Sequence, residues 1–384
     1  MASEMFEVTD GKSDRAIIRV IGVGGGGCNT VNQMVDANID GVDFVCANTD
    51  RQHLERCKTN AILQLGSAIT RGLGAGSNPE VGRQAALEDK DRIRDLIEGT
   101  DLLFITAGMG GGTGTGAAPV IAEIAREMDV LTVAVVTKPF EFEGKKRVLA
   151  ALKGIEEMEK FADSMVLIPN EKLRLVMGPR TTMVAAFKAA NDVLQNAVQG
   201  IADLITRPGL QNVDFADVKT VMLNRGKAMM GLGTGSGDDR AQKAVEMALS
   251  SPLLDDLELA NARGVLVNIC SDDTLNLDEV QLIMDRVRAI SSDDVDVKYG
   301  TSLDPSLNGE MRVTVVATGL GGKLLLPSGV VTPITSAPIR RVVNLDEPAI
   351  SRVNQKKTIP ENLRELVMDE SLLDIPAFLR AQAD

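Results

Sequence analysis

The feature that most constrains this chain is a repeated alternation of short apolar runs with stretches of helical periodicity over residues 16–168. Nearly continuous apolar strands that alternate with helices are typical of a parallel sheet covered on both faces. We therefore predict a doubly wound α/β domain, in which ligands lie at the carboxyl ends of the strands. The apolar runs are Ala16–Val23, Phe44–Ala47, Ala61–Leu65, Leu102–Ala107, Val130–Val136 and Ser164–Ile168.

The rest of the 384-residue chain is long enough for a second unit and a tail. Apolar residues recur at helical spacing over Met183–Ile205 and stop at Arg207-Pro208-Gly209, which predicts a long helix between the two units. Residues 210–320 predict a smaller α+β domain. Its helix-like segments are Asp239–Leu249 and Leu277–Ile290, and its strand-like segments include Gly264–Cys270 and Met311–Ala317. Prolines spread through a stretch without aromatic residues predict a flexible linker before an apolar terminal peptide.

Composition excludes several classes of function. The formal net charge is −13, and the chain has no Trp and one Tyr, so we predict no direct binding of nucleic acid. The single histidine, His53, excludes zinc sites and acid–base schemes that need several histidines. Catalysis must therefore depend on carboxylates, backbone groups and a bound metal.

The four cysteines, Cys28, Cys46, Cys57 and Cys270, have no CxxC spacing, and no signal peptide precedes the first strand. We therefore expect a reduced, cytoplasmic protein with no disulfide framework. The apolar runs are shorter than the roughly 20 residues that a membrane helix needs, so we expect no transmembrane segment.

The first predicted strand ends in a glycine-rich loop. Gly22, Gly24 and Gly27 fit the pattern GxGxxG, and Asp43 lies at a suitable distance for a ribose contact. Glycine lets the backbone approach a phosphate, and the following helix presents unpaired N–H groups. Taken alone, this loop is also typical of an NAD-dependent dehydrogenase.

A second glycine-rich loop, GMGGGTGTG at residues 108–116, follows the predicted strand Leu102–Ala107. Two such loops at neighbouring strand ends suit a triphosphate, and a dehydrogenase needs only one. A P-loop is absent, because Phe6 replaces the first glycine ahead of Gly11-Lys12-Ser13. We therefore expect backbone N–H groups, the hydroxyls of Thr113 and Thr115 and a Mg²⁺ ion to balance the phosphate charge.

The run GGGTGTG at residues 110–116 resembles the tubulin and FtsZ family, and further motifs of that family follow in the same order. They are GGGGCN at 24–29, ANTD at 47–50, NPEVG at 78–82, PFEFEGKKR at 139–147, NVDFADV at 212–218 and LDIPAFL at 373–379. The resemblance implies a GTPase that polymerises head to tail into protofilaments. It also implies a cytokinetic ring at the midcell division site, on the inner face of the membrane.

The resemblance implies six regions. They are an N-terminal extension (1–14), a GTP-binding domain (15–182), a central helix (183–206), an assembly domain that activates hydrolysis (207–320), a linker (321–370) and a partner-binding peptide (371–384). In relatives the terminal peptide binds membrane-tethering and regulatory division proteins such as FtsA and ZipA, a role that falls here on Leu372–Leu379.

The resemblance also assigns the ligand contacts. Gly25, Gly26, Gly27, Cys28, Asn29, Gly112, Thr113 and Gly114 would hold the phosphates, Glu143 and Arg147 the ribose, and Phe187, Asn191 and Asp192 the guanine of GTP or GDP. It assigns Mg²⁺ to the phosphates with no protein ligand, and the sequence leaves open whether K⁺ assists.

Some of these residues have simpler readings. A carboxylate at Asp192 can accept from both N1–H and the 2-amino group of guanine, but a solvated mid-helix aspartate fits as well. Glu143 and Arg147 are spaced as an i, i+4 ion pair. Phe187 suits a plain core position equally well.

Asp214 and Asp217 follow the helix breaker at Pro208 and would repel a triphosphate in their own subunit. The resemblance implies that they act on the nucleotide of the neighbouring subunit, where they polarise the attacking water. Asp214 also fits an N-cap, and the two roles are compatible. An assembly protein that binds nucleotide without hydrolysing it remains the alternative if this pair is inactive.

Two further features lead to hypotheses. Cys28, near a helix start, is expected to favour the thiolate and to be an oxidisable thiol shielded by nucleotide, although an inert packing residue fits equally well. A third glycine cluster, residues 231–237, is interpreted as a flexible strand-to-helix connection.

Overall fold

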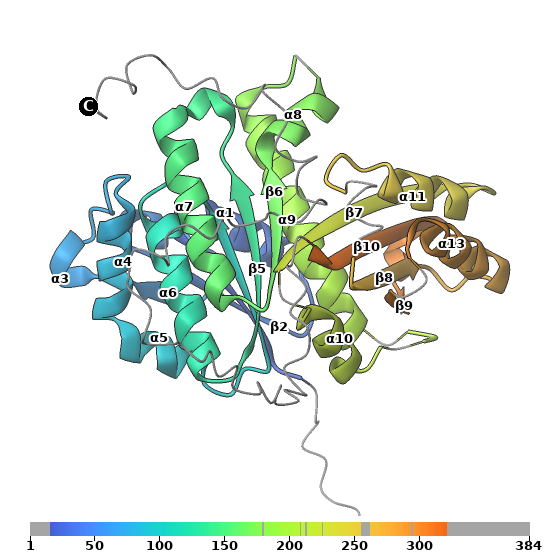
Figure 1. The fold of residues 1–384 in the computed structure, drawn as a ribbon, viewed down its shortest axis with the longest axis horizontal. Helices are drawn as coiled ribbons and strands as arrows, with labels where there is room; N and C mark the ends of the chain where they lie inside the picture. The colour runs from blue at the N-terminus through green and yellow to red at the C-terminus, as the bar shows by residue number, and fades with distance from the viewer. Residues whose placement is uncertain are drawn as a thin grey trace, which may run out of the picture. The chain divides into compact units, whose positions relative to one another are not determined.

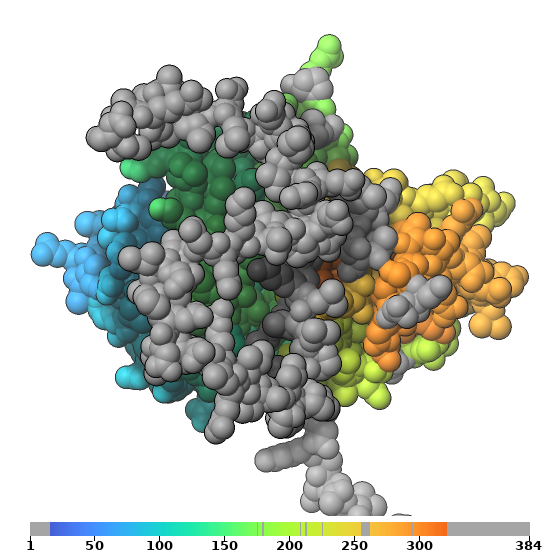
Figure 2. Space-filling view, viewed as in Figure 1, coloured from blue at the N-terminus to red at the C-terminus, as the bar shows by residue number. Residues whose placement is uncertain are grey.

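The computed structural model describes residues 16–178, 180–207, 209–211, 213–224, 226–254, 262–292 and 295–320. In these residues ten strands form one sheet in the order β3-β2-β1-β4-β5-β6-β7-β10-β8-β9 (Figure 1). The strands are β1 Ile18–Val23, β2 Val42–Asn48, β3 Ala61–Gln64, β4 Leu102–Gly108, β5 Leu131–Lys138, β6 Ser164–Pro169, β7 Gly226–Ser236, β8 Gly264–Ser271, β9 Asp296–Leu303 and β10 Glu310–Leu320. The space-filling view shows the early part of the chain, in blue, on one side and the later part, in yellow and orange, on the other (Figure 2).

The first six strands are all parallel to their neighbours, which confirms the doubly wound fold. β1 pairs with β2 on one side and with β4 on the other, so the strand order reverses between β1 and β4. In open α/β sheets the ligand crevice lies at such a reversal, outside the carboxyl ends of the strands. Both predicted glycine loops leave the sheet there.

Helices cover both faces of these strands. The helices and short 3₁₀ turns are α1 Gly24–Asp36, α2 Arg51–Leu54, α3 Ser67–Thr70, α4 Pro79–Glu88, α5 Lys90–Ile97, α6 Thr113–Glu127, η1 Glu141–Glu143, α7 Lys145–Phe161, α8 Asn170–Met177, α9 Met183–Thr206, α10 Phe215–Met222, α11 Arg240–Leu249, α13 Leu277–Ile290 and η2 Pro305–Leu307. One core packs α1, α9 and α10 against the sheet, and a second packs α4 to α7 against the opposite face. Figure 1 shows α6 and α7 side by side in front of the strands.

The long helix predicted at Met183–Ile205 is confirmed as α9. α9 contacts strands from both parts of the sheet, and the Asn268 side chain on β8 donates to the carbonyl of Gly200 at 3.0 Å. β7 continues the sheet beside β6 through three parallel residue pairs and is antiparallel to β10. A third core lies between α11, α13 and strands β8 to β10. The boundaries assigned to the central helix and its flanking domains stay a prediction.

The interpretation of residues 231–237 as a flexible connection is wrong for Gly231 to Ser236, which belong to strand β7. At Gly231, Gly233 and Gly235, a side chain would point toward α11. A Cβ at these three positions would lie 2.1, 1.9 and 2.0 Å from the carbonyl oxygens of Ala248, Ala244 and Arg240. The glycines therefore alternate because a helix packs directly on the strand backbone, a contact that has no sequence signal apart from the spacing itself.

The N-terminal extension, the linker and the terminal peptide lie outside the described residues. No helix in the described part of the chain is both long and apolar enough to span a membrane.

Candidate functional site

The two glycine loops meet at the carboxyl ends of β1 and β4. Gly24 opens α1 with φ +71°, and a Cβ there would lie 2.8 Å from the backbone nitrogen of Gly114 at the start of α6. Only glycine combines this conformation with so close an approach. The loops therefore place the N-terminal ends of two helices side by side, where unpaired N–H groups and two dipoles favour an anion.

A cavity of about 500 Å³ opens at this junction. It gathers ten of the thirteen residues that the resemblance assigned to the nucleotide. They are Gly25, Gly26, Asn29, Gly112, Thr113, Gly114, Glu143, Arg147, Phe187 and Asn191. In the first turn of α1, Gly25, Gly26 and Asn29 are exposed whereas Gly27 and Cys28 are buried. The exposed side of this turn thus faces the cavity.

Gly27, Cys28 and Asp192 do not line the cavity. Gly27 packs against the sheet, where a Cβ would lie 2.3 Å from the carbonyl oxygen of Thr106. The carboxylate of Asp192 accepts a hydrogen bond from the Gln33 side chain on α1. Asp192 is half-buried and paired, which differs from a freely solvated aspartate, and its contact with guanine stays a prediction.

The prediction that Cys28 favours the thiolate is wrong. Hydrogen bonds with Cys46 and Cys57, together with burial, raise the pKa of Cys28 well above its usual value. Its Sγ points into the sheet toward the carbonyls of Gly22 at 3.5 Å and Ala47 at 3.8 Å. Cys28 is fully buried with no ligand present, so it needs no nucleotide to shield it.

The loop threonines have different surroundings. The hydroxyls of Thr49 and Thr113 lie 2.6 Å apart, which ties the ANTD segment to the start of α6. The hydroxyl of Thr115 accepts from the Gly110 N–H at 2.7 Å, and Thr115 does not line the cavity. Thr115 therefore stabilises the loop conformation, and the expected phosphate contact of its hydroxyl has no support in this geometry.

Glu143 and Arg147 form the i, i+4 ion pair that their spacing predicted, at 2.6 Å. A second oxygen of Glu143 accepts from the backbone N–H of Phe140 at 3.0 Å, which fixes the carboxylate on η1. Both residues line the cavity, so the pair and a ligand contact are compatible.

An aromatic group closes one side of the site. The Phe187 ring packs edge-on against Phe140 with centroids 5.6 Å apart, and Phe140 stacks on Phe142 at 5.1 Å. Phe187 is 40% exposed and lines the cavity, so it is not a plain core residue. An exposed ring that packs against Phe140 provides a flat apolar surface for a base.

Asn170 was missed by sequence reasoning. It begins α8 directly after β6, lines the cavity and is 4% exposed. Its side-chain oxygen is buried, and no hydrogen-bond partner for it exists among the described residues. An unpaired buried acceptor in a cavity wall is a natural contact for a ligand donor. Its place at the end of a parallel strand was the available sequence signal.

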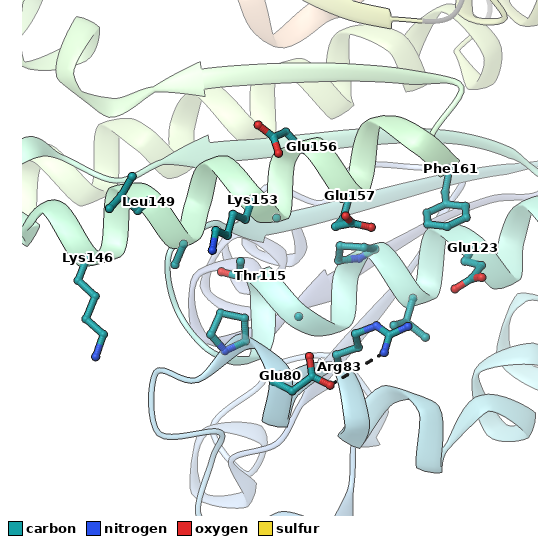
Figure 3. Close-up of a pocket in the computed structure, with 16 residues that line it drawn as sticks. Glu80, Arg83, Thr115, Glu123, Lys146, Leu149, Lys153, Glu156, Glu157 and Phe161 are labelled. Carbon is teal, nitrogen blue, oxygen red and sulfur yellow. Dashed lines mark ion pairs between the residues drawn. The ribbon is translucent and has the colours of Figure 1, made fainter. Parts of the chain in front are cut away.

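Two other candidates for a ligand site, Asp43 and a second cavity, lie away from this cavity. Asp43, which the dehydrogenase alternative needs, is near the amino end of β2, pairs with Arg19 at 3.3 Å and is absent from the cavity lining. A larger cavity of about 750 Å³ lies between α4, α6 and α7. Figure 3 shows charged side chains of both signs around it, among them Arg83, Lys153 and Glu157. It contains none of the thirteen residues that the resemblance assigned to the nucleotide, although Thr115 lines it.

Asp214 and Asp217 do not line the cavity either. Asp214 is exposed and occupies the N-cap position of α10, but its side chain makes no capping hydrogen bond. The N-cap position is thus confirmed, while the carboxylate itself is not used for capping. Asp217, in the first turn of α10, forms an ion pair with Lys298 at 3.3 Å.

Comparison with known proteins agrees with this geometry. The Tubulin/FtsZ family GTPase domain matches residues 17–178, and the C-terminal domain of the FtsZ family matches residues 226–321. A cell division protein FtsZ from Wigglesworthia glossinidia brevipalpis is 54% identical, covering 99% of this chain and 100% of that protein. The chain belongs to the tubulin and FtsZ family.

Within the tubulin and FtsZ family, cell division protein FtsZ of Pseudomonas aeruginosa is 51% identical, with 99% of this chain and 100% of that protein covered. A solved FtsZ dimer from M. jannaschii, described as empty, has a TM-score of 0.77 at 44% identity and covers 80% of this chain and 89% of that one. CetZ2 from Haloferax volcanii, with a TM-score of 0.67 at 22% identity over 79% and 93% of the two chains, shares the fold.

The tubulin and FtsZ family is a family of GTPases, and this chain is a cell-division GTPase that binds GTP and GDP. The residues present fit such a ligand. Two helix N-termini offer N–H groups to phosphates, Phe187 offers a ring face, and Asn170 offers an unpaired acceptor.

Proposed function

We propose that this GTPase polymerises head to tail and that its hydrolytic site is completed by Asp214 and Asp217 of the adjacent subunit. The observation that carries the proposal is the position of Asp214. Its carboxylate is exposed, makes no capping hydrogen bond and lies outside the cavity of its own subunit. A carboxylate near a triphosphate within one subunit would repel it, whereas one that arrives with a second subunit can act only in the polymer.

The ligand contacts follow the cavity wall. Backbone N–H groups at Gly25, Gly26 and the start of α6 would hold the phosphates, as they would at any helix N-terminus. Glu143 and Arg147 would contact the ribose, and Phe187 and Asn191 the guanine. Gly27, Cys28 and Asp192 remain assigned by resemblance alone, with Asp192 reaching guanine only if it exchanges its bond with Gln33.

Mg²⁺, when bound, would neutralise phosphate charge as the terminal phosphoryl group leaves. The ion would be held by phosphate oxygens and water.

The chain's own residues would orient the attacking water and stabilise the charge that develops on the phosphate oxygens. The carboxylates of Asp214 and Asp217 accept hydrogen bonds from the attacking water and orient it toward the terminal phosphate. The N–H groups of the two glycine loops meet the charge that spreads over the phosphate oxygens. Loss of that phosphate removes the contacts that it makes across the interface, which weakens association between subunits.

The proposal extends to assembly and partners. Self-association is supported by the solved FtsZ dimer at 44% identity. We place the polymer in the cytoplasm, in the cytokinetic ring on the inner face of the membrane at midcell. The terminal peptide Leu372–Leu379, outside the described residues, would recruit tethering and regulatory proteins such as FtsA and ZipA.

The decisive experiment measures phosphate release from GTP per molecule as a function of protein concentration, with pelleting in parallel and with ATP and NAD as controls. A rate that appears only above a threshold, together with GTP-dependent pelleting, supports a site shared between subunits. A constant rate per molecule with nothing pelleted would contradict the roles of Asp214 and Asp217.

A further inference from the structure

Three of the four cysteines converge on one point beneath the first glycine loop. Cys28 lies on α1, Cys46 on β2 and Cys57 after α2, and their Sγ atoms all lie within 4.8 Å of one another. The fourth, Cys270, lies on β8 and takes no part. In the sequence the three are separated by 18 and 11 residues, with no metal-binding spacing.

The sulfur separations suit a shared ion. A Zn²⁺–thiolate bond is about 2.3 Å, so thiolates bound to one ion lie roughly 4 Å apart. The three Sγ atoms therefore need to move by less than about 1 Å to bind one ion. A disulfide would instead draw two sulfurs to about 2 Å and leave the third without a role.

The surroundings of the cluster also favour a soft cation. Cys28 and Cys46 are fully buried, whereas Cys57 is partly exposed, so the cluster opens to solvent on one side. The nearest lysine in sequence, Lys58, is already paired with Asp36. The three sulfurs thus form a mostly buried cluster with one accessible side.

We propose that Cys28, Cys46 and Cys57 form a three-thiolate site for one soft d¹⁰ metal ion, Zn²⁺ or Cu⁺. Thiolates are the ligands that select such ions. Binding forms three metal–sulfur bonds, breaks three S–H bonds and releases one proton from each thiol to water. Zn²⁺ would take a water molecule as its fourth ligand on the open side at Cys57, and Cu⁺ would be three-coordinate.

The bound ion would link α1 to β2 and to the segment after α2. The site differs from the nucleotide cavity, because none of the three cysteines lines that cavity. Metal binding should therefore stabilise the folded protein, since the unfolded chain does not hold the three thiols together.

The test uses the full-length protein with GDP bound, reduced and then freed of reductant without air. Zn²⁺ and Cu⁺ are titrated separately against a chromophoric chelator while the thiolate-to-metal charge-transfer band is recorded. We expect one ion per chain with a charge-transfer band. Cys57→Ser should weaken binding by at least about 100-fold, since loss of a direct ligand costs no less than loss of a supporting group. Cys270→Ser is the matched control and should bind as the wild type does.

Equal binding by Cys57→Ser and Cys270→Ser, or a failure of both ions to give the band, would overturn the proposal. A mass lower by two hydrogen atoms in the protein as purified in air, with oxygen as the oxidant and no metal uptake, would overturn it in favour of a disulfide. If Cys57→Ser does not fold, alkylation of the wild type decides the question. The metal should then protect Cys57, the partly exposed thiol of the cluster, and leave Cys270 unchanged, and unchanged labelling of Cys57 would count against the site.

Discussion

The side-chain nitrogen of Lys298 on β9 lies 3.3 Å from a carboxylate oxygen of Asp217 on α10. Lys298 also lies 3.6 Å from Asp296, so one lysine bridges two carboxylates of similar exposure. The carboxylate proposed to act on a neighbouring subunit is thus oriented within its own subunit by a strand of the second region. An exposed pair of this kind contributes little to stability, which makes the two aspartates suitable for a matched comparison.

Asp217→Ala should lower GTP turnover in the polymer by about 100-fold or more, because the attacking water loses an orienting carboxylate. Filaments should persist and pellet with GTP, since hydrolysis weakens association and is now absent. Turnover and pelleting are measured on the same samples. Asp296→Ala removes the other partner of Lys298 and should keep turnover near the wild-type rate. Equal loss in both variants would assign the effect to the ion pair instead of to catalysis.

Two buried asparagines should respond in opposite ways to replacement by alanine. Asn170 has an unpaired oxygen in the cavity wall, so Asn170→Ala should weaken GDP binding by about tenfold, the cost of roughly one hydrogen bond, with little change in the stability of the ligand-free protein. Isothermal titration with GDP and thermal unfolding measure the two effects.

Asn268 is the control, because its amide donates to Gly200 and its oxygen accepts from Ser302 at 3.1 Å. Asn268→Ala should lower stability by about 1–3 kcal/mol, because two buried partners lose their hydrogen bonds. GDP affinity should not change. Unaltered GDP affinity in Asn170→Ala would remove Asn170 from the ligand site.

Gly233→Ala tests the direct packing of α11 on β7. The new Cβ would lie 1.9 Å from the carbonyl oxygen of Ala244, so the helix must move away from the strand. We expect a loss of about 1–3 kcal/mol in the free energy of unfolding, as is typical of overpacking, measured by urea denaturation. GDP binding should stay intact because Gly233 lies far along the sheet from β1 and β4. A fully stable variant would restore the interpretation of this segment as a flexible connection.

Asp203 should make stability depend on pH. Burial raises its pKa to about 6, despite the attraction of Arg207, whose guanidinium lies 3.1 Å away. A carboxyl group with a raised pKa binds its proton more tightly in the folded than in the unfolded state. Its contribution to stability is therefore full below the unfolded pKa near 4 and is lost as the pH rises through about 6.

Asp203→Asn, which stays neutral, should remove this contribution. The difference in unfolding free energy between variant and wild type should change by about 1 kcal/mol per pH unit between pH 4 and 6 and level off outside that window. Urea unfolding of both proteins across this range provides the measurement. A difference that is constant with pH would show that Asp203 ionises alike in the folded and unfolded chains.

Several elements of the fold followed from local sequence alone. Strands β1 to β6 and helix α9 were placed within a few residues, because buried parallel strands and an amphipathic helix leave strong periodic patterns. The two glycine loops were also recognised locally, since a strand, a glycine run and a helix start are adjacent in the chain. The Glu143–Arg147 pair was predicted because both partners lie on one helical turn.

Contacts that depend on tertiary packing could not be predicted from local sequence patterns. Asn170 became a site residue only because β6 ends beside the cavity, and Gly231 to Gly235 became a strand only because α11 covers it. Cys28 was expected to ionise from its place near a helix start, yet Cys46 and Cys57 reverse that expectation. In each case the deciding contact is made by tertiary packing and not by the local sequence.

The sequence by itself determined the class of fold, the two phosphate-type loops and the family, because these depend on residues that are neighbours along the chain. Tertiary structure alone decided that ten strands in the described residues form one sheet, which side of α1 faces the cavity, and that three distant cysteines share one point. The physical reason is that burial, pKa and ligand geometry depend on distances through space, and these are set when helices pack on the sheet.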